Sequence, residues 1–271
     1  MKDITVIILT KNEEKNIKKC ILSAKQIADR IIVVDSGSLD QTVPLAQKLN
    51  AEVYKHDWES HARQFNWALE HCSIATSWVY RLDADEIITK ELAKEINLFL
   101  NSKESKNYSA CSMRWQMFFM GKRLRHGGTH KIYVTRLFRY GKAYVEDKKM
   151  DERLVVQGQT KQLKNDFIHY DYKGLDAWLI KHIGYSNLEL STFRNNIEEC
   201  TNVNKKQKQR RDFYYKMPRY LRARLYFWYR YYLQLGFLDG EAGRIYLYLQ
   251  AYWYRFIVDA KIFEMERDTI K

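Results

Sequence analysis

Apolar residues along the first hundred positions are grouped in short runs rich in β-branched side chains, and polar stretches separate the runs. The runs cover residues 4–9, 31–34, 51–54 and 78–80. Continuous apolar runs of this length predict strands that are buried on both faces of a parallel sheet. Apolar residues between the runs recur at helical spacing, and they predict helices from residue 17 and over residues 42–49, 60–71 and 90–100. The alternation predicts an α/β fold with a mostly parallel sheet flanked by helices.

Three carboxylates follow the fourth run, in the sequence Asp83-Ala84-Asp85-Glu86. The carboxyl ends of strands in open α/β sheets form the edge at which ligands bind. Two carboxylates at a spacing of two can hold a divalent cation, Mg²⁺ or Mn²⁺, through oxygen ligands, and the cation can bind a diphosphate. The alternative is an acidic turn that caps the next helix, since Glu86 and Glu91 also suit a helix N-terminus.

Polar residues also end the first two predicted strands. Asp35, in Asp-Ser-Gly-Ser, can accept a hydrogen bond from the N–H of a nucleotide base, or it can simply build a turn. Thr10 and Glu13 are expected beside it. Arg63 opens the helix before the acidic strand, where it either contacts the base or a phosphate or remains a solvated charge.

The C-terminal third combines positive charge with aromatic helical faces. Residues 201–224 contain nine Lys or Arg and one acid, Asp212. Apolar residues then recur at spacings of three and four, at Leu221, Leu225, Trp228, Tyr232 and Leu235, and a second series runs from Ala242 to Phe256. Basic, aromatic helices of this kind are typical of proteins that lie on an anionic membrane surface. The alternative is packing against the preceding domain or in a homo-oligomer interface.

The net charge and the aromatic content of the chain favour an anionic partner. The 271 residues carry a formal charge of +13 and include 20 Tyr and 7 Trp, which suit a nucleotide, a membrane surface or a nucleic acid. The four Cys are scattered without a Cys-x-x-Cys pair, so we expect free thiols in a reducing cytoplasm. The sequence lacks Gly-x-Gly-x-x-Gly after the first strand and any P-loop motif, which argues against dinucleotide and P-loop folds. We also expect neither a signal peptide nor a membrane-spanning helix.

Four motifs in the N-terminal half resemble the nucleotide-binding half of the family 2, GT-A fold, inverting glycosyltransferases. They are Thr10-Lys11-Asn12-Glu13, Val34-Asp35-Ser36-Gly37-Ser38-x-Asp40-x-Thr42, Ala62-Arg63-Gln64-x-Asn66 and Asp83-Ala84-Asp85. Later stretches, among them Arg136-Leu137-Phe138-Arg139 and Leu163-Lys164-Asn165-Asp166-x-Ile168-His169-Tyr170, are similar to the bacterial lipopolysaccharide inner-core β-1,4-glucosyltransferase group. The resemblance implies a catalytic domain over residues 1–200, with a sugar-nucleotide half (1–100) and an acceptor half (101–200), and a helical extension over residues 201–271.

The resemblance also implies roles for particular residues. The motif positions expected to bind a UDP-sugar donor are Thr10, Asn12, Glu13, Asp35, Ser36, Arg63, Asp83, Ala84 and Asp85, and Arg136 either joins them at the diphosphate or is structural. Asp85 would bind Mg²⁺ or Mn²⁺, Asp83 the ribose or the metal, and His169 is a third possible ligand, although a histidine beside aromatic residues is more often part of the core. The metal would stabilise the departing nucleoside diphosphate.

An inverting displacement needs a carboxylate that deprotonates the acceptor hydroxyl. Residues 145–153 form the acid-dense stretch of the second half. The related group usually ends this stretch in His-Glu, so Glu152 is the first candidate base and Asp151 stands where the histidine would be. Asp151 and Asp147 remain alternatives, as does a solvated charged turn.

These inferences predict an inverting hexosyltransferase, with UDP-glucose as the first donor candidate and a lipopolysaccharide core or other lipid-linked glycan as acceptor. We expect it in the cytoplasm, peripheral on the inner face of the membrane, with no nucleic-acid partner. The alternatives are a metal-dependent nucleotidyltransferase and, less favoured, a basic nucleic-acid-binding protein.

Overall fold

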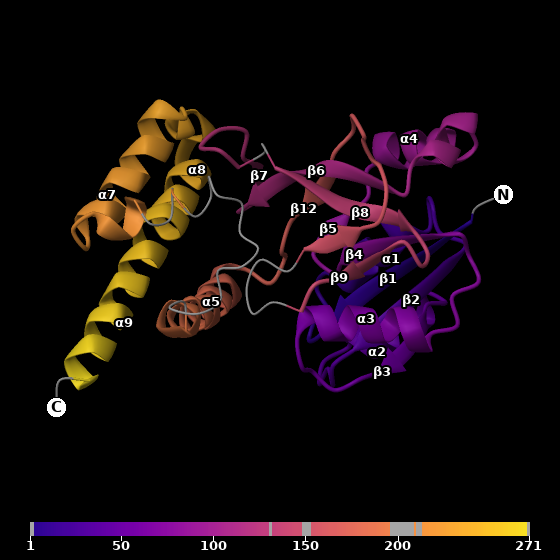
Figure 1. Cartoon of the computed structure of the whole chain (residues 1–271), viewed down its shortest axis with the longest axis horizontal. Helices are drawn as coiled ribbons and strands as arrows, with labels where there is room; N and C mark the ends of the chain where they lie inside the picture. Colours follow the sequence, from indigo (N-terminus) through magenta and orange to yellow (C-terminus); the bar gives the residue numbers. More distant parts are fainter. Residues whose placement is uncertain (1–2, 130–131, 148–152, 196–208, 210–212, 270–271) are drawn as a thin grey trace. The chain divides into compact units, whose positions relative to one another are not determined.

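The computed structural model describes residues 3–129, 132–147, 153–195, 209 and 213–269 (Figure 1). Contacts divide the chain into two compact units. The sheet unit comprises Met1–Phe118 and His130–Lys173, and the helical unit comprises Phe119–Thr129 and Gly174–Lys271. The domain boundary predicted near residue 200 lies outside the described residues, and the contacts assign the preceding helix to the helical unit.

The sheet unit is built on a mixed sheet with the strand order β3-β2-β1-β4-β8-β6-β12-β5. The strands of this path are β1 (Ile4–Thr10), β2 (Arg30–Asp35), β3 (Glu52–Lys55), β4 (Trp78–Asp83), β5 (Glu86–Ile87), β6 (Ala110–Phe119), β8 (Tyr133–Arg139) and β12 (Phe167–His169). Strands β3, β2, β1 and β4 are parallel, whereas β8 runs antiparallel to both β4 and β6. Short β11 (Thr160–Gln162) adds to β6, and β9 (Ala143–Val145) pairs with β10 (Leu154–Val156) in a separate ribbon.

Helices cover both faces of this sheet because the strand residues alternate between two apolar clusters. Val6 and Ile8 of β1 lie in the cluster that receives Ile21 of α1, whereas Ile7 lies in the cluster that receives Phe65 of α3. The helices are α1 (Ile17–Ala24), α2 (Thr42–Lys48), α3 (His61–His71) and α4 (Lys90–Leu100), with the 3₁₀ turn η1 (Lys103–Asn107). The predicted fold class is confirmed, with the antiparallel insertion of β8 as the feature that the apolar runs did not indicate.

The helical unit contains the C-terminal helices. They are α5 (Leu175–Asn195), α7 (Leu221–Trp228), the π-helical η2 (Tyr229–Leu233), η3 (Gly236–Asp239), α8 (Gly240–Leu247), the π-helical η4 (Tyr248–Trp253) and α9 (Tyr254–Thr269), and the short strand β7 (Lys122–Arg123) precedes them. Tyr254, Val258 and Ile262 of α9 pack against Leu190 and Phe193 of α5. None of the helices among the described residues combines the length and the apolar character needed to span a bilayer.

Candidate active site at the carboxyl edge of the sheet

The loops that follow β1 and β2 are fastened together at the carboxyl edge of the sheet. The side-chain oxygen of Asn12 accepts the Leu39 N–H at 2.9 Å, and the Asn12 N–H donates to the Ser38 hydroxyl at 2.8 Å. The Thr42 hydroxyl accepts the Glu13 N–H at 2.7 Å. Asn12 has a φ of 55°, a left-handed conformation that Asn adopts more readily than most residues. The spacing of the first two motifs therefore reflects, at least in part, the hydrogen bonds that shape this loop pair.

Asp35 builds the turn at the end of β2. Its Oδ1 accepts hydrogen bonds from the hydroxyls of Thr10 at 3.0 Å and Ser38 at 2.5 Å, and its Oδ2 accepts the N–H groups of Gly37 at 3.0 Å and Ser38 at 2.8 Å. A carboxylate offers about four acceptor sites, and Asp35 is only 3% exposed. These contacts correspond to the turn-building alternative for Asp35.

The neighbouring positions at this edge are also closely packed. Thr10, Ser36 and Ala84 are buried. The Ser36 hydroxyl accepts a hydrogen bond from the Gln64 side chain of α3 at 2.9 Å. This contact connects the third motif to the second and fixes the distance between α3 and the end of β2.

One guanidinium contacts two carboxylates, one at the end of β4 and one at the start of β5. Arg136, on β8, donates to Asp83 at 2.8 Å and to Glu86 at 2.5 Å, and the second oxygen of Glu86 accepts the Asp83 N–H at 3.1 Å. Arg136 reaches this place because β8 pairs with β4, with Leu137 opposite Tyr80. Arg136 therefore contacts the acidic motif directly. This position is compatible both with a structural role and with a role at the diphosphate.

The charges of this cluster change the pKa values of its members. Burial opposes ionisation of Asp83, yet Arg136 and Arg81 outweigh it and lower the pKa of Asp83 to about 2. Burial raises the pKa of Glu86 to about 7, against the opposing attraction of Arg136. The pKa of Arg136 is raised by both carboxylates, although burial opposes its charge. Of the two carboxylates that face Arg136, Asp83 is thus the one whose ionised form is favoured, since Arg81 also attracts it and burial dominates at Glu86.

His169 lies beside Asp85 in the structure. Its Nε2 is 3.4 Å from Asp85 Oδ2, and the Asp85 side chain is 11% exposed. The strand pairing brings them together, because β12 runs antiparallel to β5 with His169 opposite Glu86, and the Tyr170 N–H donates to the Asp85 carbonyl at 2.9 Å. The structure thus brings together two residues that the sequence proposed as metal ligands from positions 84 apart in the chain.

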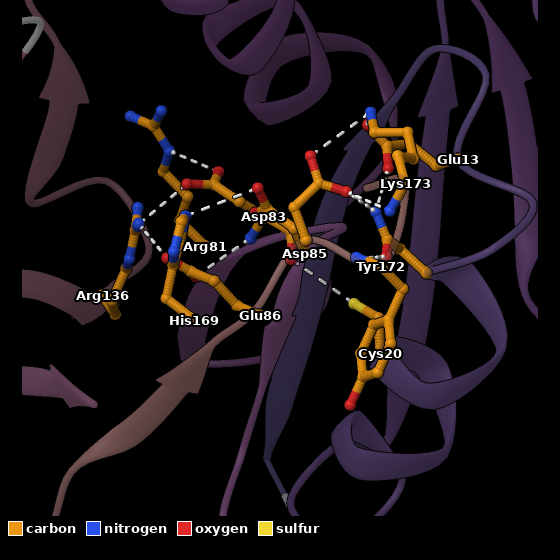
Figure 2. Close-up of polar contacts among 12 residues, drawn as sticks. Glu13, Cys20, Arg81, Asp83, Asp85, Glu86, Arg136, His169, Tyr172 and Lys173 are labelled. Carbon is orange, nitrogen blue, oxygen red and sulfur yellow. Dashed lines mark hydrogen bonds and ion pairs between the residues drawn. The ribbon is translucent and has the colours of Figure 1, made fainter. Parts of the chain in front are cut away.

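A second polar network occupies the opposite side of Asp85 in Figure 2. Lys173 Nζ donates to Glu13 Oε1 at 2.6 Å, and the Asn16 amide nitrogen donates to Glu13 Oε2 at 2.7 Å and to Asp171 at 2.9 Å. The Asn16 oxygen accepts the Tyr172 N–H at 2.9 Å. Burial raises the pKa of Glu13, and the hydrogen bond from Lys173 opposes that rise. Residues 171–173 are thereby tied to the start of α1.

The acid-dense stretch is attached to α3. The Asn66 side chain exchanges two hydrogen bonds with the backbone of Val145, at 2.8 and 2.9 Å. Asp147 accepts from Arg63 Nε at 2.8 Å and from the Ser60 hydroxyl at 3.2 Å, which lowers the pKa of Asp147. Two of the predicted site residues, Arg63 and Asp147, therefore contact each other. Asp151 and Glu152 lie outside the described residues.

Some residues of the site were missed by the sequence-based reasoning. Glu86 was noted only as a third carboxylate, with helix capping as the alternative, whereas Thr89 is the residue that caps α4. Asn16, Asp171 and Lys173 were not singled out. A polar Asn directly before an apolar helix was the only local signal among them, since the positions of Asp171 and Lys173 depend on the pairing of β12.

The structure thus gathers carboxylates, an imidazole and cations at the carboxyl edge of a mixed α/β sheet, which is the edge at which open α/β sheets bind ligands. The family model for glycosyl transferase family 2 matches residues 5–155, which is more than half of the sequence. The chain therefore belongs to glycosyl transferase family 2.

Individual relatives agree with this assignment. A Rickettsia typhi glycosyltransferase is 37% identical over 121 residues, which cover 45% of this chain and 41% of that protein. The match thus spans about two fifths of the Rickettsia protein. A lipopolysaccharide core biosynthesis glycosyltransferase of Rhizobium meliloti is 27% identical over 197 residues, covering 69% of this chain and 70% of that protein. Among solved structures, glucosyl-3-phosphoglycerate synthase of Mycobacterium tuberculosis, in complex with Mn²⁺ and UDP, aligns with a TM-score of 0.35 at 21% identity, over 42% of this chain and 44% of that one.

Proposed function

We propose that the protein is an inverting glycosyltransferase that transfers a hexose, with glucose as the first candidate, from a UDP-sugar to a lipopolysaccharide core or another lipid-linked glycan. The proposal rests on one observation in this family 2 chain. His169 Nε2 and Asp85 Oδ2 lie 3.4 Å apart at the sheet edge, next to Asp83. The Rhizobium meliloti relative, which is named for core biosynthesis, supports the acceptor class.

The donor set fits Mg²⁺ or Mn²⁺. Asp85 and Asp83 offer carboxylate oxygens, which suit both cations, whereas the imidazole nitrogen of His169 suits Mn²⁺ better than the harder Mg²⁺. Within the part of the chain that the structure describes, no group of three or more His, Cys, Asp or Glu side chains forms a ready cage. Mg²⁺ commonly binds through one or two carboxylates and completes its shell with substrate phosphates and water. When bound, the cation would supply positive charge against the departing diphosphate.

The donor is held in this proposal by the loop pair that contains Thr10, Asn12, Glu13, Asp35 and Ser36. In this proposal Arg63 and Arg136 contribute positive charge to the donor site, and Ala84 belongs to it as the middle residue of the acidic motif. Because Asp35 is saturated by its own turn, it acts by fixing the shape of the loop around the nucleoside.

The transfer itself requires a base. One carboxylate takes the proton of the acceptor hydroxyl, the oxygen forms a bond to the anomeric carbon, and the bond from that carbon to the diphosphate oxygen breaks with its electron pair on the diphosphate. Glu152 is the proposed base, with Asp151 as the alternative. Asp147 is a weaker candidate, because Arg63 stabilises its ionised form and thereby lowers its basicity.

The proposal is tested by measuring nucleoside diphosphate release from a panel of sugar nucleotides with Mn²⁺ or Mg²⁺ and a lipopolysaccharide core acceptor. We expect release from a UDP-hexose, with strong loss in Asp85→Ala and Glu152→Gln. The exposed carboxylate variant Asp57→Asn serves as the matched control and should keep its activity. Release of pyrophosphate from a nucleoside triphosphate, with no turnover of any sugar nucleotide, would overturn the proposal in favour of nucleotidyl transfer.

A further inference from the structure

Helix α7 and η2 present an apolar face to the surroundings. Leu221, Leu225, Trp228 and Tyr232, which we call the apolar stripe, are 47%, 49%, 58% and 46% exposed. Their spacing of four, three and four places them on one face of a helix, and the rings of Trp228 and Tyr232 stack with centroids 4.5 Å apart.

The opposite side of the same helix carries buried charge. Arg222 is buried and its Nε donates to Asp259 of α9 at 2.9 Å. Arg230 is also buried, and its Nε donates to the Gly127 carbonyl at 2.7 Å. A helix on the surface of a water-soluble protein normally turns its apolar face inward and its charges outward. Here the four apolar side chains of the stripe are exposed while Arg222 and Arg230 are buried, although burying charge is costly and exposed apolar area is unfavourable in water.

The exposed apolar surface continues past the end of η2. The next exposed large apolar side chains along the chain are Leu233, Leu235, Phe237 and Leu238. Together with the apolar stripe they form an exposed run within residues 221–238. A run this dense is typical of a surface that contacts a membrane or a protein.

The charges around the stripe favour an anionic bilayer. Residues 213–238 contain five Lys or Arg and no Asp or Glu. Lys216 and Arg224 are exposed among them. Trp and Tyr prefer the boundary between hydrocarbon and water, and Lys and Arg interact with anionic headgroups. A second copy of the chain is less suitable, because a symmetric contact would place two acid-free, positively charged surfaces against each other.

We propose that the apolar stripe inserts into the headgroup region of an anionic phospholipid bilayer, with Lys216 and Arg224 against the lipid phosphates. The inference rests on the proposed function, in which the acceptor is attached to a lipid. Lipid binding is measured without donor or acceptor, so a failure of one proposal does not imply a failure of the other.

The test is flotation of the full chain with vesicles of phosphatidylcholine and phosphatidylglycerol, compared with vesicles of phosphatidylcholine alone. We expect binding to the anionic vesicles, and a reduction of roughly 10-fold or more in Leu225→Ser/Trp228→Ser, because two apolar side chains no longer enter the interface. Ile180→Ser/Phe263→Ser is the matched control, since it removes two exposed apolar side chains from α5 and α9. The control should bind like the wild type.

A second measurement reports insertion directly. Lipids brominated on their acyl chains should quench part of the tryptophan fluorescence, and Trp228→Phe should lose that part while it still binds vesicles. Leu225→Ser/Trp228→Ser should keep the melting temperature of the wild type, because both positions are exposed. Unchanged vesicle binding of this folded variant would overturn the proposal. So would a dimer of the wild type, without lipid binding, that the same variant converts to a monomer.

Discussion

Arg136 and Asp83 form an ion pair of 2.8 Å between residues that lie 53 positions apart in the chain. The same guanidinium also contacts Glu86, which is 1% exposed in its side chain. The acidic motif at the end of β4 is therefore held in place by a residue from β8. This contact explains how carboxylates can be concentrated at one sheet edge without unfolding it, since their mutual repulsion is offset by a buried cation.

Replacement of Arg136 by Met should destabilise the sheet unit. It leaves the buried Glu86 and the partly buried Asp83 without their shared cation, and loss of one partner of a buried pair costs about 3–5 kcal/mol. Urea unfolding measures the change. Arg244→Met is the control, because the Arg244–Glu241 pair is exposed and should contribute at most about 1 kcal/mol. Equal stability losses in the two variants would contradict the prediction.

Glu86→Gln should partly rescue Arg136→Met. The amide oxygen of Gln can still accept the Asp83 N–H, which Glu86 accepts at 3.1 Å, while a carboxyl whose ionisation burial opposes is replaced by a neutral group. The double variant should therefore be more stable than Arg136→Met alone, by a margin that a double-mutant cycle reports as a coupling energy. Additive losses would show that Arg136 and Glu86 act independently.

The sequence predicted the strands and the residues at their ends better than the contacts between distant segments. The apolar runs identified β1, β2 and β4, because a strand that is buried on both faces has apolar residues at successive positions. The placement of Arg136 and His169 beside the acidic motif depends on antiparallel pairing of β8 with β4 and of β12 with β5, and local periodicity carries no information about such pairing. Lys173 was missed for the same reason.

The C-terminal helices illustrate a different limit. The spacing of Leu221, Leu225 and Trp228 predicted a helical face, and the structure contains that helix. The spacing of apolar residues shows that they share one face of a helix, but it does not show whether that face is buried or exposed. The outward direction follows from Arg222 and its buried partner Asp259, which are 37 positions apart.

The identity of the catalytic base can be tested by comparing variants of Glu152 and Asp147. If Glu152 is the base, Glu152→Gln should lower turnover by roughly 10²–10⁴-fold, the usual contribution of general base catalysis. Asp147→Asn should leave turnover within a few-fold, because it removes only an exposed pair with Arg63 that contributes little to stability. Single-turnover rates with saturating donor separate the chemical step from binding. The opposite ranking of the two variants would assign the base to Asp147.

The Glu13–Lys173 pair should make stability depend on pH. Burial raises the pKa of Glu13 above its ordinary value of 4.5, so the folded state binds this proton more tightly than the unfolded state does. Stability should therefore fall as the pH rises from about 4.5 through the raised pKa, and Glu13→Gln should remove this component. Lys173→Met should deepen the fall, because Lys173 lowers the pKa of Glu13. Urea midpoints measured between about pH 4 and pH 8 test this, with the exposed Lys18→Met as control; a midpoint profile unchanged in Glu13→Gln would contradict it.

The buried pair of Arg222 and Asp259 should contribute to the stability of the helical unit and not to that of the sheet unit. Their side chains are 3% and 1% exposed, so Asp259→Ala leaves a buried guanidinium uncompensated and should cost about 3–5 kcal/mol. Hydrogen exchange should show faster exchange in α7 and α9 and unchanged protection in β1 and β4, because both residues of the pair belong to the helical unit. Asp259→Ala combined with Arg222→Met should recover part of the loss, since no charge is then left unpaired. If exchange rises equally in β1, the two units unfold together and the inward orientation of Arg222 stabilises the whole chain.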